Sequence, residues 1–253
     1  MTITYDNVVT WGRSFDEYRR MFHLSERQLR LKILGCADGP ASFNAEMTKQ
    51  GYSVVSCDPL YQFTTAQIQA RIDFTYETVM AQTLANRELF VWKDIASPEE
   101  LGDLRREAMN EFLADYDRGG QGRYVAAELP ELPFVSSSFD LALCSHFLFL
   151  YSSNLSLEFH GWAIKGMCRV AKEVRIFPLL THNAEPSPFV MPLIESFRKA
   201  GRQVSVERVP YEFQRPDYKA GNQAFCPLSM AIDTHSFLRA FVTLWSILIG
   251  ILN

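Results

Sequence analysis

Leu34-Gly35-Cys36-Ala37-Asp38-Gly39 is the stretch that decides the fold of this 253-residue chain. It follows an apolar run, Leu31–Leu34, and precedes a helix-like run, Ala41–Gln50; a second apolar run, Tyr52–Cys57, then leads to Asp58. Strand, glycine turn, helix, strand and acid in this order are typical of a βαβ unit that binds a nucleoside. Glycine lets the backbone approach a ligand closely, and the helix N-terminus offers free N–H groups. The pattern therefore predicts a Rossmann-like α/β fold with a nucleoside site at the turn.

The acid after the second run is expected to bind the ribose. Asp58 lies about twenty residues beyond the turn, where a carboxylate accepts hydrogen bonds from both ribose hydroxyls. The turn has only Gly35 and Gly39, and lacks the third glycine of a dinucleotide site. Pro40 removes one N–H that a phosphate would use. These features favour S-adenosylmethionine over a more negatively charged ligand. The alternative is an ordinary strand–helix turn with Asp58 on the surface.

Three segments resemble class I S-adenosylmethionine-dependent methyltransferases. Leu34–Gly39 is similar to the first motif of that superfamily. Glu128–Phe134 and Ser138–His146 resemble the stretch in which an acid follows the third strand, Leu-Pro-Phe comes next, and Ser-Phe-Asp opens the fourth strand. Cys168–Ile176 resembles the link from a helix into the fifth strand. The whole resembles a bacterial-type branch of these enzymes.

The resemblance implies a mostly parallel seven-stranded sheet with helices on both faces, closed by an antiparallel hairpin whose first arm is Val204–Val209. It places Glu128 at the adenine amino group, the backbone N–H of Leu129 at the adenine ring, and Ser145 with His146 beside the sulfonium. The cofactor contacts that it implies are Gly35, Cys36, Ala37, Gly39, Asp58, Pro59, Glu128, Leu129 and Ser145.

One departure from the superfamily concerns the end of the first strand. An acid is usual there, at the position of Ile33 or Gly35, and this chain has neither. Asp38 within the turn is expected to substitute in part. Without such substitution the chain would be a non-catalytic Rossmann-like protein with impaired cofactor binding, which is one alternative function. A second alternative, an NAD(P)-dependent oxidoreductase, explains the turn and Asp58 but not the stretch Glu128–His146.

The implied reaction is methyl transfer to a small-molecule acceptor. Transfer from a sulfonium is an in-line displacement, so the enzyme mainly aligns donor and acceptor and excludes water. A general base is needed only when the acceptor carries a proton of high pKa. His146 is the candidate base because it follows the fourth strand; His160 and His182 are further candidates. A histidine that merely packs against the cofactor is the alternative.

Composition restricts the other classes of partner. The net charge is −4 and no dense basic stripe is present, which disfavours nucleic acid. The five cysteines are spread singly, so neither a disulfide framework nor a zinc site is expected, and no metal site is predicted. Met1–Trp11 lacks a positively charged leader and an apolar segment, and we expect a cytoplasmic protein. The length suits one domain, residues 1–253.

Helices and strands alternate along the rest of the chain. A helical insertion at about 62–120 separates the second strand from the third. Within it, Thr64–Asn86 has helical spacing, and Ser97-Pro98-Glu99-Glu100 begins a second helix. The insertion is interpreted as a lid over the site or as a structural buttress. The other expected elements are helices at Ser14–Gln28, Leu155–Val170 and Pro188–Ala200, and strands at Phe139–Ser145, Val174–Leu180 and Gln203–Val209.

An atypical apolar tail occupies residues 224–253. Phe237–Leu252 is apolar on every face and shorter than the roughly twenty residues of a transmembrane helix. Three interpretations stay open: the tail packs on the domain or on a second subunit of a homo-oligomer, it is non-native sequence from an altered reading frame, or it anchors the protein to a membrane.

Overall fold

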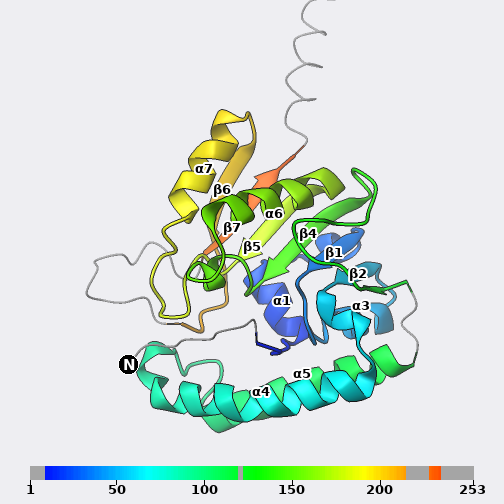
Figure 1. Cartoon of the computed structure of the whole chain (residues 1–253), viewed down its shortest axis with the longest axis vertical. Helices are drawn as coiled ribbons and strands as arrows, with labels where there is room; N and C mark the ends of the chain where they lie inside the picture. The colour runs from blue at the N-terminus through cyan, green and yellow to red at the C-terminus, as the bar shows by residue number, and fades with distance from the viewer. Residues whose placement is uncertain (1–8, 119–121, 215–227, 235–253) are drawn as a thin grey trace, which may run out of the picture.

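The computed structural model describes residues 9–118, 122–214 and 228–234. Within these residues the strands form a seven-stranded sheet in the order β3-β2-β1-β4-β5-β7-β6 (Figure 1). β1 to β5 run parallel, and β7 is antiparallel to both β5 and β6. This confirms the expected mostly parallel sheet that ends in an antiparallel hairpin. The strands are β1 Ile33–Cys36, β2 Val54–Cys57, β3 Tyr124–Val125, β4 Phe139–Ser145, β5 Ala171–Phe177, β6 Gln203–Arg208 and β7 Leu228–Asp233.

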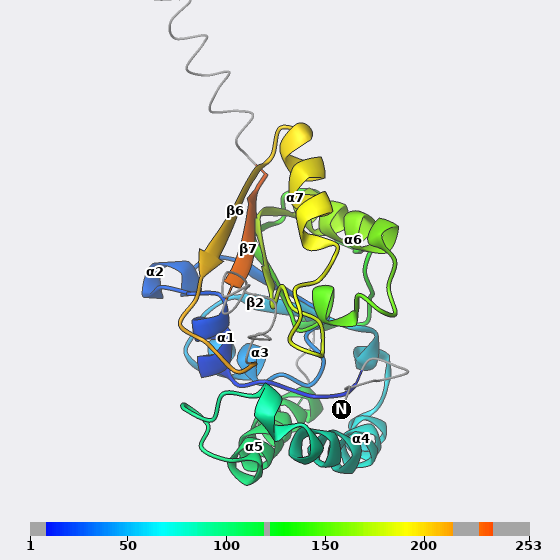
Figure 2. The ribbon, with the colours of Figure 1, turned by 90° about the vertical axis from the view of Figure 1, so that its left-hand side faces the viewer.

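Helices cover both faces of the sheet (Figure 2). The near-continuous apolar strands bury both faces, as parallel strands do. Leu34, Ala142 and Cys144 pack toward α6 and α7, whereas the adjacent Ile33 and Leu141 pack toward α1 and α3. The helices are α1 Phe15–Met21, α2 Glu26–Leu29 and α3 Phe43–Lys49 on one face, and α6 Leu157–Val170 and α7 Val190–Lys199 on the other.

The insertion after β2 forms two long helices, as the sequence predicts. They are α4 Thr65–Ala85 and α5 Pro98–Asp117, and they lie across the edge at which the parallel strands end (Figures 1 and 2). The Thr64 hydroxyl accepts a hydrogen bond from the backbone N–H of Gln67 at 3.3 Å, and Ser97 caps α5 through Glu100 at 3.2 Å. Three short 3-10 helices complete the described elements: η1 Pro59–Gln62, η2 Arg87–Leu89 and η3 Phe149–Tyr151.

A buried ion pair fastens the insertion to the rest of the molecule. The side chain of Arg105 in α5 is fully buried, and both of its terminal nitrogens donate to the carboxylate of Glu17 in α1. The Tyr211 hydroxyl, beyond β6, donates to the same carboxylate at 2.6 Å, and Ser14 donates its N–H at 2.9 Å. Burial alone would raise the pKa of Glu17, but the adjacent Arg105 guanidinium lowers it to about 2. Three segments distant in sequence therefore meet at one carboxylate.

The N-terminal helix differs from the expectation. In place of one helix over Ser14–Gln28, α1 ends at Met21 and α2 starts at Glu26. Ser14 caps α1 as expected, but Ser25 and Gln28 form a second capping box, and His23 between the helices has a left-handed backbone (φ 48°). A second N-cap within the apolar spacing therefore interrupts the helix.

Two strand boundaries also differ. β5 begins at Ala171 and ends at Phe177, because the chain passes directly from α6 into the strand, whereas Val174–Leu180 was expected. β7 lies within the range assigned to the apolar tail; Met230 and Ile232 are buried in the core beside Val174 of β5 and Val204 of β6. The run Phe237–Leu252 lies outside the described residues. None of the helices in the described part of the chain is long and apolar enough to cross a membrane.

Candidate functional site

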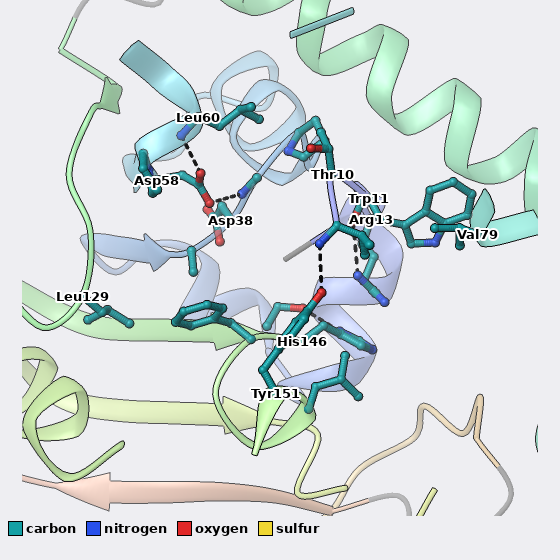
Figure 3. Close-up of a pocket in the computed structure, with 18 of the residues that line it drawn as sticks. Thr10, Trp11, Arg13, Asp38, Asp58, Leu60, Val79, Leu129, His146 and Tyr151 are labelled. Carbon is teal, nitrogen blue, oxygen red and sulfur yellow. Dashed lines mark hydrogen bonds between the residues drawn. The ribbon is translucent and has the colours of Figure 1, made fainter. Parts of the chain in front are cut away.

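A cavity of about 640 Å³ opens at the carboxyl edge of the parallel strands. Its walls come from the turn after β1, from the ends of β2, β3 and β4, from the insertion, and from the segment before α1 (Figure 3). Gly35 and Cys36 are absent from the lining and lie beneath the turn, where Cys36 is fully buried. The residues predicted from the sequence that line the cavity are Ala37, Asp38, Gly39, Asp58, Pro59, Glu128, Leu129, Ser145, His146 and His182.

The turn after β1 is wound around the Asp38 side chain. A Cβ atom on Gly35 would lie 1.7 Å from Oδ2 of Asp38, so only glycine leaves room for the carboxylate. The Tyr18 hydroxyl donates to Oδ1 at 2.8 Å, and the Ser56 hydroxyl donates to Oδ2 at 2.6 Å. Burial raises the pKa of Asp38 to about 6, against the opposing effect of these two hydrogen bonds. Asp38 thus supplies a buried carboxyl group beside the end of β1, although no acid stands within the strand.

Asp58 is fixed by two backbone amides at the same end of the cavity. The N–H of Gly39 donates to Oδ2 at 2.9 Å, and the N–H of Leu60 donates to Oδ1 at 2.7 Å (Figure 3). Burial raises the pKa of Asp58 to about 6, and the two amide hydrogen bonds oppose this shift. Because a carboxylate oxygen accepts two hydrogen bonds, each oxygen keeps one acceptor position for a ligand hydroxyl.

Arg13 and His146 lie in the part of the cavity away from Asp58 (Figure 3). Arg13 lies near His146, and His182 also lines this part. Burial, together with the charge of Arg13, lowers the pKa of His182 to about 4 and that of His146 well below its usual value. Both imidazoles are therefore neutral at pH 7. Nδ1 of His146 lies 2.9 Å from the Ser145 hydroxyl.

His160 is placed outside the cavity lining. Its side chain is fully buried, with Nδ1 2.8 Å from the carbonyl oxygen of Ser156 and Nε2 2.8 Å from that of Leu148. These contacts join α6 to the segment after β4, which is a structural role. Of the three histidines considered as bases, His146 and His182 reach the cavity.

Several lining residues carry no sequence motif. Trp11 and Arg13 precede the first helix, Tyr18 lies in α1, Tyr151 in η3, and Phe213 follows β6. The segment before α1 is held across the cavity because the N–H of Val9 donates to the Tyr151 hydroxyl at 3.0 Å (Figure 3). Arg13 is the one charged residue in the stretch from Val8 to Ser14. This isolated charge is the one sequence feature that indicates this wall of the cavity. Among the described residues, no group of three or more His, Cys, Asp and Glu side chains is placed to hold a metal ion.

The seven-stranded sheet and the cavity at its carboxyl edge define a Rossmann-like α/β protein. Over 221 residues the chain is 32% identical to the "uncharacterized protein MJ0045" of Methanocaldococcus jannaschii, a match that covers 86% of this chain and 94% of the archaeal protein. The chain belongs to the family of that protein. No protein-family model matches it.

Solved methyltransferase structures resemble the chain at low identity. The magnesium protoporphyrin IX methyltransferase (ChlM) of Synechocystis PCC 6803 with bound SAM has a TM-score of 0.39 and 11% identity, over 87% of this chain and 90% of that chain. A SAM-dependent methyltransferase from Aquifex aeolicus has a TM-score of 0.37 and 14% identity, over 86% of this chain and 87% of that chain.

Proposed function

We propose that this protein transfers a methyl group from S-adenosylmethionine to a small molecule bound in the same cavity. The observation that carries the proposal is the Asp58 carboxylate, which the amides of Gly39 and Leu60 hold at the wall of a cavity of about 640 Å³. Cavities of this size enclose most of the surface of a small ligand. The cofactor, when bound, supplies an electrophilic methyl group, and the protein aligns the acceptor and excludes water.

The residues at the turn fit this cofactor better than a dinucleotide. Asp38, Asp58 and Glu128 line this part of the cavity, and their carboxyl groups favour a cationic ligand over a pyrophosphate. The cavity lining also includes a cation, Arg71. Its guanidinium carbon lies over the Phe63 ring, 4.0 Å from the ring centroid. In the bound state Asp58 would accept hydrogen bonds from the ribose, and Glu128 and Leu129 would face the adenine. His146 stays the candidate base, and its neutral imidazole is in the form that accepts a proton.

Replacing Asp58 by alanine tests the cofactor assignment. A hydrogen bond to a charged group contributes roughly 1.5–3 kcal/mol, so the affinity for S-adenosylhomocysteine should fall at least about tenfold. Isothermal titration calorimetry measures the affinity. Asp103→Ala removes an exposed carboxylate from α5 and should leave the affinity unchanged. An unchanged affinity in Asp58→Ala would refute the assignment, and wild-type protein that binds NAD in preference to S-adenosylhomocysteine would favour the oxidoreductase.

The raised pKa values of Asp38 and Asp58 predict a pH dependence of the same binding. A carboxylate accepts hydrogen bonds from ribose hydroxyls better than a neutral carboxyl group does, so affinity should rise from about pH 5 to about pH 7.5. The two carboxyl groups contribute to the stability of the free protein in the opposite sense, because each binds more protons in the native state than in the unfolded state between its unfolded pKa and about 6. The lowered pKa values of His146 and His182 act against this contribution. Calorimetry in a series of buffers measures the first effect. A smaller pH dependence in Asp58→Ala is expected, and an identical one would contradict this origin.

A further inference from the structure

We propose that the methyl acceptor is a small apolar or aromatic acid whose carboxylate pairs with Arg13. This inference rests on the proposed function, because it assigns the part of the cavity that a nucleoside at Asp58 leaves free. Four observations support it: the fixed backbone of Arg13, the Nε of its guanidinium without a partner, the pairing of the nearby acid Glu17 with Arg105 instead of Arg13, and an apolar wall of the cavity.

The backbone of Arg13 is fixed against the glycine turn. Its carbonyl oxygen accepts a hydrogen bond from the N–H of Ser42 at 3.0 Å. The preceding Gly12 packs so closely on Pro40 that a Cβ atom there would lie 2.0 Å from the Pro40 carbonyl oxygen. The side chain therefore projects into the cavity from a rigid point, on the side of His146 (Figure 3).

The guanidinium of Arg13 has unused donors. Nη1 donates to the carbonyl oxygen of Trp11 at 3.3 Å, and the buried Nε has no hydrogen-bond partner among the described residues. A buried donor without a partner costs about 1–3 kcal/mol, and a ligand acceptor would remove that cost. A guanidinium presents its donors as a planar fork that matches a carboxylate.

The charge of Arg13 is not neutralised by the groups around it. The carboxylate of Glu17 already accepts hydrogen bonds from Arg105, Tyr211 and Ser14, and it forms no ion pair with Arg13 in the described structure. Burial and the charge of Arg105 lower the pKa of Arg13 to about 10, which still leaves the group charged at pH 7. The other titratable groups that face it are neutral at this pH; they are Tyr18, Tyr151, Tyr211, His146 and His182. An anion is therefore favoured there, and a protonated amine is disfavoured.

An apolar and aromatic wall of the cavity begins beside Arg13, at Tyr151. Such a wall binds the hydrocarbon body of a ligand, whereas the polar groups fix its orientation. The combination of one cation with this wall suits an acid with an aromatic or branched body. Tyr151 lies close to Arg13, the Phe147 ring lies 6.2 Å from that of Tyr151, and the Phe159 ring lies 6.3 Å from that of Phe147. Leu150, Leu155 and Phe213 also line the cavity.

Three acids paired with their amides test the proposal on protein saturated with S-adenosylhomocysteine. The probes are benzoate, phenylacetate and 3-phenylpropionate, each compared by calorimetry with the corresponding amide. At least one acid should bind about tenfold more tightly than its amide to the wild-type protein. Arg13→Gln should abolish this preference, Arg13→Lys should keep part of it, and Arg19→Gln, which removes a cation of α1 outside the cavity lining, should leave it intact.

The same variants separate this proposal from the proposed function. The binding of S-adenosylhomocysteine to each variant is also compared with the binding of 5′-methylthioadenosine, which lacks the amino acid moiety. If Arg13→Gln weakens binding of the first and not of the second, Arg13 holds the carboxylate of the cofactor and the proposal is wrong. Equal affinity of every acid and its amide for the wild-type protein, including no binding of either, also overturns it. Wild-type protein that binds neither nucleoside would instead refute the proposed function.

Discussion

Replacing Arg105 by methionine is expected to lower the free energy of unfolding by about 3–5 kcal/mol, because it leaves the Glu17 carboxylate buried without its counter-charge. The guanidinium has no exposure to solvent, so water cannot replace it without a rearrangement of α1 against α5. Denaturation with urea, monitored by circular dichroism, measures the change. This loss of stability should be larger than the loss caused by breaking an ion pair on the surface, such as that of Arg19 with Glu26.

A neighbouring arginine gives the matched control. Arg106 is exposed on the same helix and lies over the Tyr76 ring at 4.2 Å, so Arg106→Met should change stability by less than about 1 kcal/mol. The double variant Glu17→Gln with Arg105→Met removes the buried charge as well as its partner. It should be less destabilised than the sum of its two single variants. Additive losses would mean that the two side chains do not act as a pair.

Replacing Gly35 by alanine is the second change with a large expected effect. The new methyl group would occupy the position of the Asp38 carboxylate, which must then leave the hydroxyls of Tyr18 and Ser56. Overpacking and the loss of two buried hydrogen bonds together should cost at least about 2 kcal/mol of stability. Because Gly39 follows Asp38 and donates to Asp58, affinity for S-adenosylhomocysteine should also fall by more than about tenfold.

A glycine elsewhere in the fold shows what the same substitution does without a clash. At Gly161 in α6 a Cβ atom would meet only Leu193, at 3.8 Å, so Gly161→Ala should be neutral or stabilising by up to about 1 kcal/mol. Its affinity for S-adenosylhomocysteine should equal that of the wild-type protein. If Gly35→Ala retains both stability and affinity, the Asp38 carboxylate can move without cost. The turn then does not depend on its position, and the prediction is wrong.

The parts of the fold that local sequence determines were predicted well. The helical spacing of Thr64–Asn86 and the cap at Ser97 place both helices of the insertion within a residue or two, because both signals lie close together in the sequence. The glycine turn and Asp58 are likewise defined within one βαβ unit. The interruption between α1 and α2 was missed because the apolar spacing continues across it, and only the second capping box shows the break.

The other end of the site could not be predicted, because it depends on contacts between distant segments. Tyr18 meets Asp38 across 20 positions, and Val9 meets Tyr151 across 142. Such pairs have no fixed spacing, and a single arginine before a helix has the same appearance whether it faces solvent or a cavity. The position of β7 was also not predictable, because a long connection separates it from β6 and the hairpin carries no short turn motif.

The carboxylate of Glu17 has a consequence for how this family can diverge. It joins an N-terminal helix to residues 88 and 194 positions away, and its Oε1 accepts a hydrogen bond from each of them. If Arg105 is replaced first, the Glu17 carboxylate is left buried without its counter-charge. If Glu17 is replaced first, the Arg105 guanidinium is left buried without its counter-charge. Selection should therefore tolerate simultaneous exchange of the two residues and oppose either exchange alone. Positions 17 and 105 are accordingly expected to form one inherited unit, even where the surfaces of α4 and α5 drift freely.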